Sequence, residues 1–413
     1  MFERLFGEKF SRFRLGQIIF ATAVSFGLFA GDIIRIVLGV LALFFLTKEN
    51  FKFNWTRGQK ITGCILALFC AWMIVIPVIF GENPLPVRLR DAVRPVELTL
   101  WICATLLFAK DDFFVRNLKN FSITACFLYS LIALHWCFET HFALEYKNWP
   151  VLDDSHCAGA LMSGIAVWIM CEFVTAKNPF KVVFCFVTLG LGALLTIFAR
   201  FSTFWVALAA EFLAALTVLL FTDRKKFLKL LLCLVLLLSL AIGGINTVMK
   251  NNAGIRAKID QELNQLTSLR NKNLECFTSH RAQIWEDTAK AVAQKPFFGY
   301  GKDVLKQHIR PLPGGTIQWH AHNNLLEAAF EAGIPCALLL TVFCLSLFLL
   351  AAFALRNSHS FNSEAFVCVV LLAGYFTAGL AENLYMTDRC KLVFYWSVFA
   401  ACLALCNNKC TNR

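Results

Sequence analysis

The sequence has few charged residues and none of the short motifs typical of metal or redox enzymes. Only 16% of its 413 residues are charged, whereas 58% are hydrophobic, and the mean hydropathy is +0.63. None of the 17 cysteines forms a CxxC pair, which excludes a zinc ribbon or a thioredoxin-like motif. No Asp-x-Asp pair of the metal–diphosphate type occurs in the segments that we expect outside the membrane. We therefore expect no metal and no other cofactor.

The positive net charge does not indicate a nucleic-acid-binding protein. The formal charge is +12, but the basic residues are scattered between apolar stretches and do not form an aromatic-basic face. Membrane proteins keep an excess of Lys and Arg in their short cytoplasmic loops, which explains many of these residues. The others lie in external segments, where a cationic surface suits an anionic ligand.

Apolar stretches predict an all-α polytopic membrane protein with about 12 transmembrane helices. A transmembrane helix needs about 20 mainly apolar residues. We expect spans near 16–30, 33–46, 61–80, 95–109, 119–137, 157–175, 181–198, 202–221, 226–244, 331–354, 364–383 and 391–406. Only Gly31 and Asp32 separate the first two, which form either a hairpin or one broken helix. No internal repeat typical of a transporter is visible, and the first span has no signal-peptide cleavage site, so we expect it to be retained.

The loops predict the orientation and the domains. Short basic loops near 47–60, 110–118, 176–180, 222–225 and 355–363 alternate with loops that are not basic, which places both termini in the cytoplasm. The chain then divides into three parts. These are an N-terminal transmembrane bundle of about nine spans (1–244), a large external loop that carries the candidate catalytic motif (245–322), and about three C-terminal spans (323–413).

The large external loop contains two stretches with helical spacing of apolar residues. Residues 256–269 form the first. The second, 280–294, has a continuous apolar stripe made of Ile284, Trp285, Thr288, Ala289 and Val292. It predicts an amphipathic helix that lies against the mouth of the bundle and ends before Pro296 and the Gly299-Tyr300-Gly301 turn.

Three arginines gather in another external segment. Residues 84–95 (PLPVRLRDAVRP) predict a short loop between prolines that contains Arg88, Arg90 and Arg94. A guanidinium group matches two phosphate oxygens at once, so these arginines form either a phosphate site or a cluster at the membrane boundary.

The most informative stretch is 319–336, WHAHNNLLEAAFEAGIPC, where the external loop meets an apolar span. Polar side chains at a membrane boundary cost free energy, so His320, His322 and Asn323 indicate a functional site. A neutral imidazole takes a proton from a hydroxyl near pH 7, which makes His322 the candidate base. Glu327 and Glu331 share one face if this stretch is helical.

Two further arginines and several acidic residues lie at the same boundary. Arg200 lies between two apolar stretches and is either an anion ligand or a boundary arginine. Arg281 begins the predicted loop helix and is either an anion ligand or a solvated loop residue. The last external loop contains Glu382 and Asp388, which either face the same site or are ordinary loop charges.

Together these residues resemble the O-antigen ligase family. The resemblance rests on Arg200 after a span, Arg281-x3-Trp285, Pro296-x2-Gly299-x-Gly301, and His322-Asn323 followed nine residues later by Gly333. It is strongest over residues 281–336, and it departs from the family pattern at Cys336, where the family often has Gly, Thr or Tyr. The family consists of multi-spanning inner-membrane glycosyltransferases of Gram-negative bacteria, related to O-antigen polymerases and protein O-oligosaccharyltransferases.

The resemblance implies a metal-independent transfer of a glycan from undecaprenyl diphosphate to a sugar hydroxyl of lipid A–core, at the periplasmic face. Residue by residue, it implies that His322 is catalytic and that Arg200 and Arg281 bind the donor diphosphate, with Asp388 as a matching acidic residue. We expect Arg88, Arg90 and Arg94 to bind the donor diphosphate as well. His320 and Asn323 are expected to support the catalytic histidine. The expected partners are the two lipid substrates and membrane lipids, with no nucleic acid.

Other functions remain open at this level. A polymerase would use a second lipid-linked glycan as acceptor, and a protein O-oligosaccharyltransferase would use a protein. A lipid-linked sugar transporter would need polar residues along the middle of several spans. The polar residues of this sequence gather at the outer boundary instead, which favours an enzyme.

Overall fold

The computed structural model describes residues 12–27, 32–46, 51–139, 155–198, 202–251, 280–312, 315, 318–358, 361–382, 384 and 389–406, together with 256, 260, 264 and 267. These residues contain fourteen α-helices, one short 3-10 helix and no β-strand. The α-helices are α2 (Arg12–Ser25), α4 (Asp32–Leu43), α5 (Arg57–Phe80), α6 (Leu85–Phe108), α7 (Asp112–Glu139), α8 (Ser155–Thr175), α9 (Pro179–Phe198), α10 (Ser202–Thr222), α11 (Arg224–Asn251), α14 (Arg281–Gln294), α15 (Asn324–Ala332), α16 (Ile334–Asn357), α17 (Ser363–Gly379) and α18 (Arg389–Leu405).

A helix coincides with each of the twelve predicted apolar stretches, and α2 and α4 pack together as separate helices. Seven of the described helices, α5, α7 to α11 and α16, contain windows long and apolar enough to cross a membrane. The apolar parts of α4, α17 and α18 are shorter. The described chain therefore has the architecture of an all-helical polytopic membrane protein.

Helix α8 lies at the centre of the bundle. Of its apolar window, 94% is buried, and it contacts α7, α9, α10, α11, α17 and α18. Helix α11 is the opposite case, because only 11% of its apolar window is buried. Most of this apolar window is therefore left uncovered by the described helices, as expected for a surface that contacts lipid.

The prediction of a loop over 84–95 is wrong, because these residues form the beginning of α6. Pro84 is the N-cap residue, and Pro86 lies in the first turn, where a missing N–H has no helical partner to lose. The Arg88 guanidinium donates to the carbonyl oxygens of Val78 (2.6 Å) and Ile79 (2.7 Å), near the end of α5. Arg88 therefore satisfies carbonyls that a helix end leaves without donors.

The amphipathic helix predicted over 280–294 is present as α14, whereas most of the stretch 256–269 lies outside the described residues. The buried face of α14 differs from the prediction, since Ala289 is exposed and Asp287 is buried. Asp287 enters this face because Arg310 donates to it from Nε (3.0 Å) and from its backbone N–H (3.1 Å). Ile284 and Val292 pack in a small apolar cluster with Tyr300, separate from the core of the bundle.

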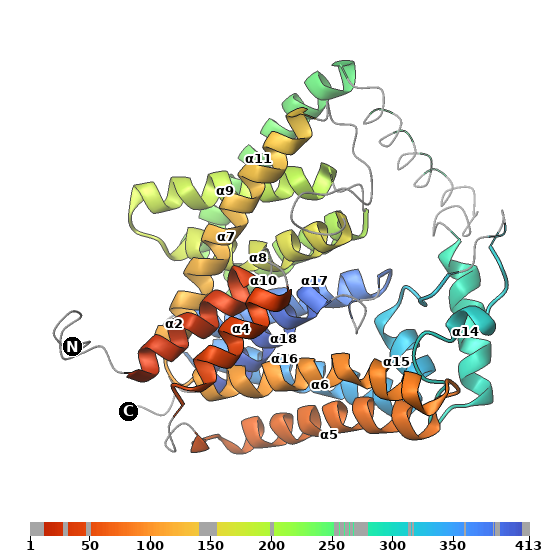
Figure 1. Ribbon diagram of the computed structural model, residues 1–413. Helices are drawn as coiled ribbons and strands as arrows, with labels where there is room; N and C mark the ends of the chain where they lie inside the picture. Colours follow the sequence, from red (N-terminus) through yellow and green to blue (C-terminus); the bar gives the residue numbers. More distant parts are fainter. Residues whose placement is uncertain are drawn as a thin grey trace.

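Glycines join α14 and its apolar cluster to α15. The Tyr300 N–H donates to the Phe330 carbonyl (2.8 Å) and the Gly301 N–H to the Glu331 carbonyl (3.0 Å). Gly299 and Gly333 have φ of +65° and +85°, and a Cβ on Gly333 would lie 2.2 Å from the Phe297 carbonyl oxygen. Only glycine allows so close an approach of two backbones. As a result, α14 and α15 lie together at one end of the bundle, beside the α5–α6 turn (Figure 1).

Candidate active site

The segment 318–323 owes its shape to the start of α15. Asn323 is the N-cap residue, and its Oδ1 accepts the backbone N–H groups of Leu325 (3.0 Å) and Leu326 (3.1 Å). Glu327, in the first turn of α15, accepts the Ala321 N–H (2.5 Å) and contacts Nδ1 of His320 (3.2 Å). These contacts fix the backbone on both sides of His322, which has a positive φ of 50°.

Two asparagines tie this segment to the end of α17. Nδ2 of Asn323 donates to the Leu380 carbonyl (3.3 Å), and Oδ1 of Asn324 accepts the Leu384 N–H (2.6 Å). A Cβ on Gly379 would lie 2.2 Å from Nδ2 of Asn324, so this contact also depends on a glycine. The two asparagines thereby hold Glu382, which follows α17, next to His322.

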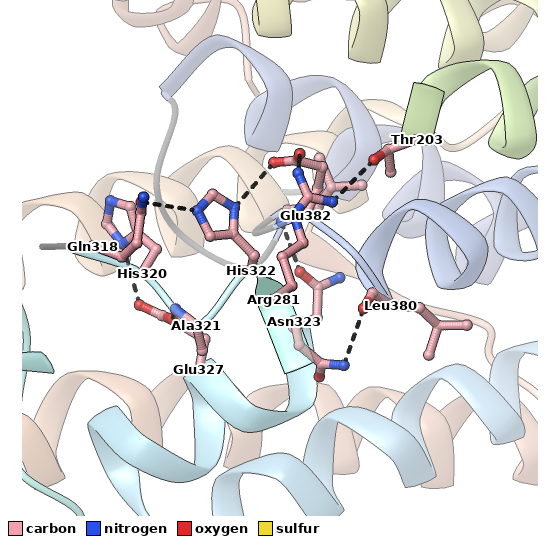
Figure 2. Close-up of polar contacts among 12 residues, drawn as sticks. Thr203, Arg281, Gln318, His320, Ala321, His322, Asn323, Glu327, Leu380 and Glu382 are labelled. Atoms are coloured by element: carbon pink, nitrogen blue, oxygen red, sulfur yellow. Dashed lines mark hydrogen bonds and ion pairs between the residues drawn. The ribbon is translucent and has the colours of Figure 1, made fainter. Parts of the chain in front are cut away.

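The two ring nitrogens of His322 have different surroundings (Figure 2). Nδ1 is buried and lies 3.6 Å from Oε2 of Glu382, an ion-pair separation longer than a hydrogen bond. Nε2 lies 3.4 Å from Oε1 of Gln318. The imidazole is 22% exposed. Because Nδ1 is buried beside a carboxylate, only Nε2 is available to a substrate.

Glu382 connects His322 to Arg281. Oε1 of Glu382 accepts from Nη2 of Arg281 at 2.7 Å, so each carboxylate oxygen serves one neighbour. Nη1 of Arg281 also contacts Oγ1 of Thr203 (3.3 Å) on α10. Glu382 is 8% exposed and Arg281 20% exposed, and such a partly buried guanidinium–carboxylate pair has well-defined geometry. Figure 2 shows the carboxylate between the two basic side chains.

The glutamates of α15 do not belong to this cluster. Glu327 and Glu331 are both buried, as are Ala328 and Ala332. Burial raises the pKa of the Glu331 carboxyl well above its usual range, and the nearby Lys302 opposes this shift. The two glutamates are therefore internal supports of α15.

The remaining candidate residues lie elsewhere or outside the described part of the chain. Arg200 and Asp388 are outside the described residues, although Thr203, the partner of Arg281, follows Arg200 closely in sequence. Arg90 and Arg94 are exposed on α6, and Arg90 contacts Asp91 at 3.2 Å. His320 and Asn323 flank His322 and shape its backbone.

Sequence reasoning identified Glu382 only as one of several charges in the last external loop, and it missed Gln318. Arg281 and Glu382 are 101 residues apart in sequence, and no local pattern predicts that they pair. Gln318 precedes His322 by only four residues, and this closeness in sequence is the feature that could have identified it as a site residue.

One nitrogen of His322 is buried beside a carboxylate, the other lies beside the Gln318 amide, and Arg281 binds the same carboxylate. These groups can take up a proton and hold an anion. Residues 184–341 match the family model described as O-antigen ligase. This range includes Arg200, Arg281, Gln318, His322 and Gly333. A search of curated proteins returned no match.

Proposed function

The chain belongs to the O-antigen ligase/polymerase superfamily through residues 184–341, and from this premise we propose that it is an O-antigen ligase. It transfers a glycan from undecaprenyl diphosphate to a sugar hydroxyl of lipid A–core, at the periplasmic face of the inner membrane. The observation that carries the proposal is His322, whose buried Nδ1 lies beside Glu382, the carboxylate that also binds Arg281, while Nε2 lies on the side of Gln318.

In the proposed reaction, His322 activates the acceptor. Nε2 takes the proton of the acceptor hydroxyl as its oxygen attacks the anomeric carbon of the donor glycan. A new glycosidic C–O bond forms, the C–O bond to the diphosphate breaks, and undecaprenyl diphosphate leaves with the bonding electrons. A base positioned in this way contributes a factor of about 10² to 10⁴ to the rate.

Arginines stabilise the negative charge of the leaving diphosphate in this proposal. Arg281 already binds an oxyanion, the Glu382 carboxylate, at 2.7 Å, and its planar group suits phosphate oxygens equally well. The role proposed for Arg200 in binding the diphosphate rests on the sequence resemblance, because this residue lies outside the described part of the chain. Arg88, Arg90 and Arg94 are assigned a weaker role at the beginning of α6, since Arg88 donates to carbonyls of α5. Positive charge from arginines stabilises the departing diphosphate without a metal.

Glu382 positions both groups in this proposal. Its carboxylate favours the tautomer of His322 with the proton on Nδ1, which leaves the lone pair on Nε2 for the acceptor. In this tautomer the Gln318 amide turns its N–H2 group, not its oxygen, toward Nε2. It also stabilises the imidazolium that forms when the proton arrives. The arrangement follows the general logic of a base held by an acidic residue.

The position of the site suits two lipid substrates. The site residues come from α14, the segment before α15 and the segment after α17, at one end of the bundle (Figure 1). If both termini are cytoplasmic, this end faces the periplasm. Each substrate then keeps its lipid tail in the bilayer and its sugars in water, and holding the two together supplies much of the rate enhancement.

A gel of lipopolysaccharide tests the proposal, with extracts from a strain that lacks the gene and from strains complemented with wild type or with His322→Ala. Long-chain lipopolysaccharide should disappear, undecaprenyl-linked polymer should accumulate, and only wild type should restore the pattern. Cores capped with a single repeat would identify a polymerase instead. Unchanged lipopolysaccharide in all lanes would refute the proposal and direct attention to protein glycosylation or transport.

A further inference from the structure

Gln318 lies where the acceptor sugar must approach His322. Since Nδ1 is buried, a substrate hydroxyl can reach the imidazole only at Nε2. Oε1 of Gln318 is 3.4 Å from this nitrogen, and Figure 2 shows the amide on the side of the ring opposite Glu382. A hydroxyl bound to Nε2 is therefore within reach of the Gln318 amide.

The backbone holds Gln318 in this position. Ala321 and His320 are both anchored to Glu327, and the positive φ of His322 turns the chain so that its side chain approaches that of Gln318. The amide is thus placed by the same contacts that place the base. Groups fixed by their surroundings bind a ligand with less loss of conformational entropy.

We propose that Gln318 is an acceptor-binding residue, and that Gln318 and His322 together hold two adjacent hydroxyl groups of the acceptor sugar. The inference rests on the proposed transferase function. Adjacent ring hydroxyl oxygens are separated by about the length of a hydrogen bond, about 2.9 Å. The 3.4 Å between the amide and the imidazole nitrogen is close to this spacing. One hydroxyl gives its proton to Nε2 while its neighbour is hydrogen-bonded to the amide.

The chemistry of a carboxamide suits this position. It offers two N–H donors and one oxygen acceptor, so it binds a hydroxyl in either orientation. It carries no charge, so it neither repels the donor diphosphate nor competes with Glu382 for Arg281. The pair of side chains would therefore select sugars that present a neighbouring hydroxyl beside the one that reacts.

The test is steady-state kinetics of the full-length protein in proteoliposomes. The probes are undecaprenyl-diphosphate-linked glycan and lipid A–core, both extracted from the gene-deletion strain. Gln318→Met keeps the length of the side chain and removes its hydrogen bonds. Loss of one neutral hydrogen bond should raise the acceptor KM about fivefold, which corresponds to about 1 kcal/mol. We expect kcat and the donor KM to stay within twofold of wild type, because the lost contact is to the acceptor alone.

Gln307→Met is the matched control, because Gln307 is an exposed glutamine in the 3-10 helix Leu305–Gln307. It should leave all constants unchanged. An unchanged acceptor KM in Gln318→Met would overturn the inference, and so would a rise in the donor KM or a lower unfolding temperature than that of Gln307→Met. Absence of transfer by wild type would instead refute the proposed function, so the two failures are distinguishable.

Discussion

Replacement of Glu382 by glutamine is the sharpest test of the site. Oε2 of Glu382 lies 3.6 Å from Nδ1 of His322, and two unit charges at this separation interact by about 4 to 5 kcal/mol at an effective dielectric of about 20. The imidazole is 22% exposed, and only part of the proton's charge has arrived in the transition state. We therefore expect Glu382→Gln to lose about half of this energy, about 2 kcal/mol, which lowers kcat about thirtyfold.

The donor KM should not rise in this variant. Glutamine releases Arg281 from its ion pair, so the guanidinium remains available to the diphosphate. Transfer in proteoliposomes, measured at saturating acceptor and varied donor, separates the two constants. Glu286→Gln is the matched control, because Glu286 is an exposed acid on α14 that pairs with Lys290. A kcat of Glu382→Gln within twofold of wild type would refute the reasoning, as would an equal loss in the control.

Three further predictions concern the residues of the site, the glycine at position 333 and the ion pair of Asp287 with Arg310. His322→Ala, Arg200→Ala and Arg281→Ala should each abolish transfer in the lipopolysaccharide assay while the proteins still insert in the membrane, whereas His320→Ala and His308→Ala should be milder. Equal loss at every histidine, rescued by added metal, would overturn the metal-free mechanism. Gly333→Ala should lower stability by about 2 kcal/mol or more, because its φ is +85° and a Cβ would lie 2.2 Å from the Phe297 carbonyl oxygen. Gly315→Ala, with φ +79° and no atom within 4 Å of the added Cβ, should cost only about 1 kcal/mol in the same thermal unfolding measurement. Asp287→Asn should make α14 easier to cleave by protease at neutral pH. The Arg310 side-chain hydrogen bond holds the pKa of Asp287 below its usual range, so its stabilisation is complete above about pH 4 and is lost as the pH falls through the folded-state pKa. The difference between the two proteins should therefore shrink as the pH falls toward and below the folded-state pKa, and a difference that grows on acidification would contradict this assignment.

The positions of the helices could be predicted from the amino-acid pattern. Each apolar stretch of about 20 residues coincides with a helix, because a backbone in lipid must satisfy its own hydrogen bonds. In residues 280–294, the helical spacing of the apolar residues was sufficient to predict α14, because this spacing places them on one face of a helix. The boundary of α6 was missed, since the prolines and arginines of 84–95 have the composition of a loop, although prolines are also compatible with a first helical turn.

The sequence also indicated the chemical types at the site. A histidine followed by asparagine at a membrane boundary pointed to a base, and arginines in the external segments pointed to an anion. The structure brings Arg281 to His322, while Arg200 and Asp388 lie outside the described residues and their roles stay predictions. The stripe predicted for the buried face of α14 did not include Asp287, because its partner Arg310 lies 23 residues away and outside the helical pattern.

The acidic partner of His322 depends on how distant segments of the chain pack together. Glu382 reaches Arg281 and His322 because Asn323 and Asn324 bind the backbone at the end of α17, and because Gly299, Gly301 and Gly333 join α14 to α15. This packing also decided that Nε2 of His322 faces Gln318 while Nδ1 is buried. Helical periodicity depends on residues that are close in sequence. These contacts instead depend on how four separate segments of the chain pack together, and the spacing of residues within one segment does not predict that packing.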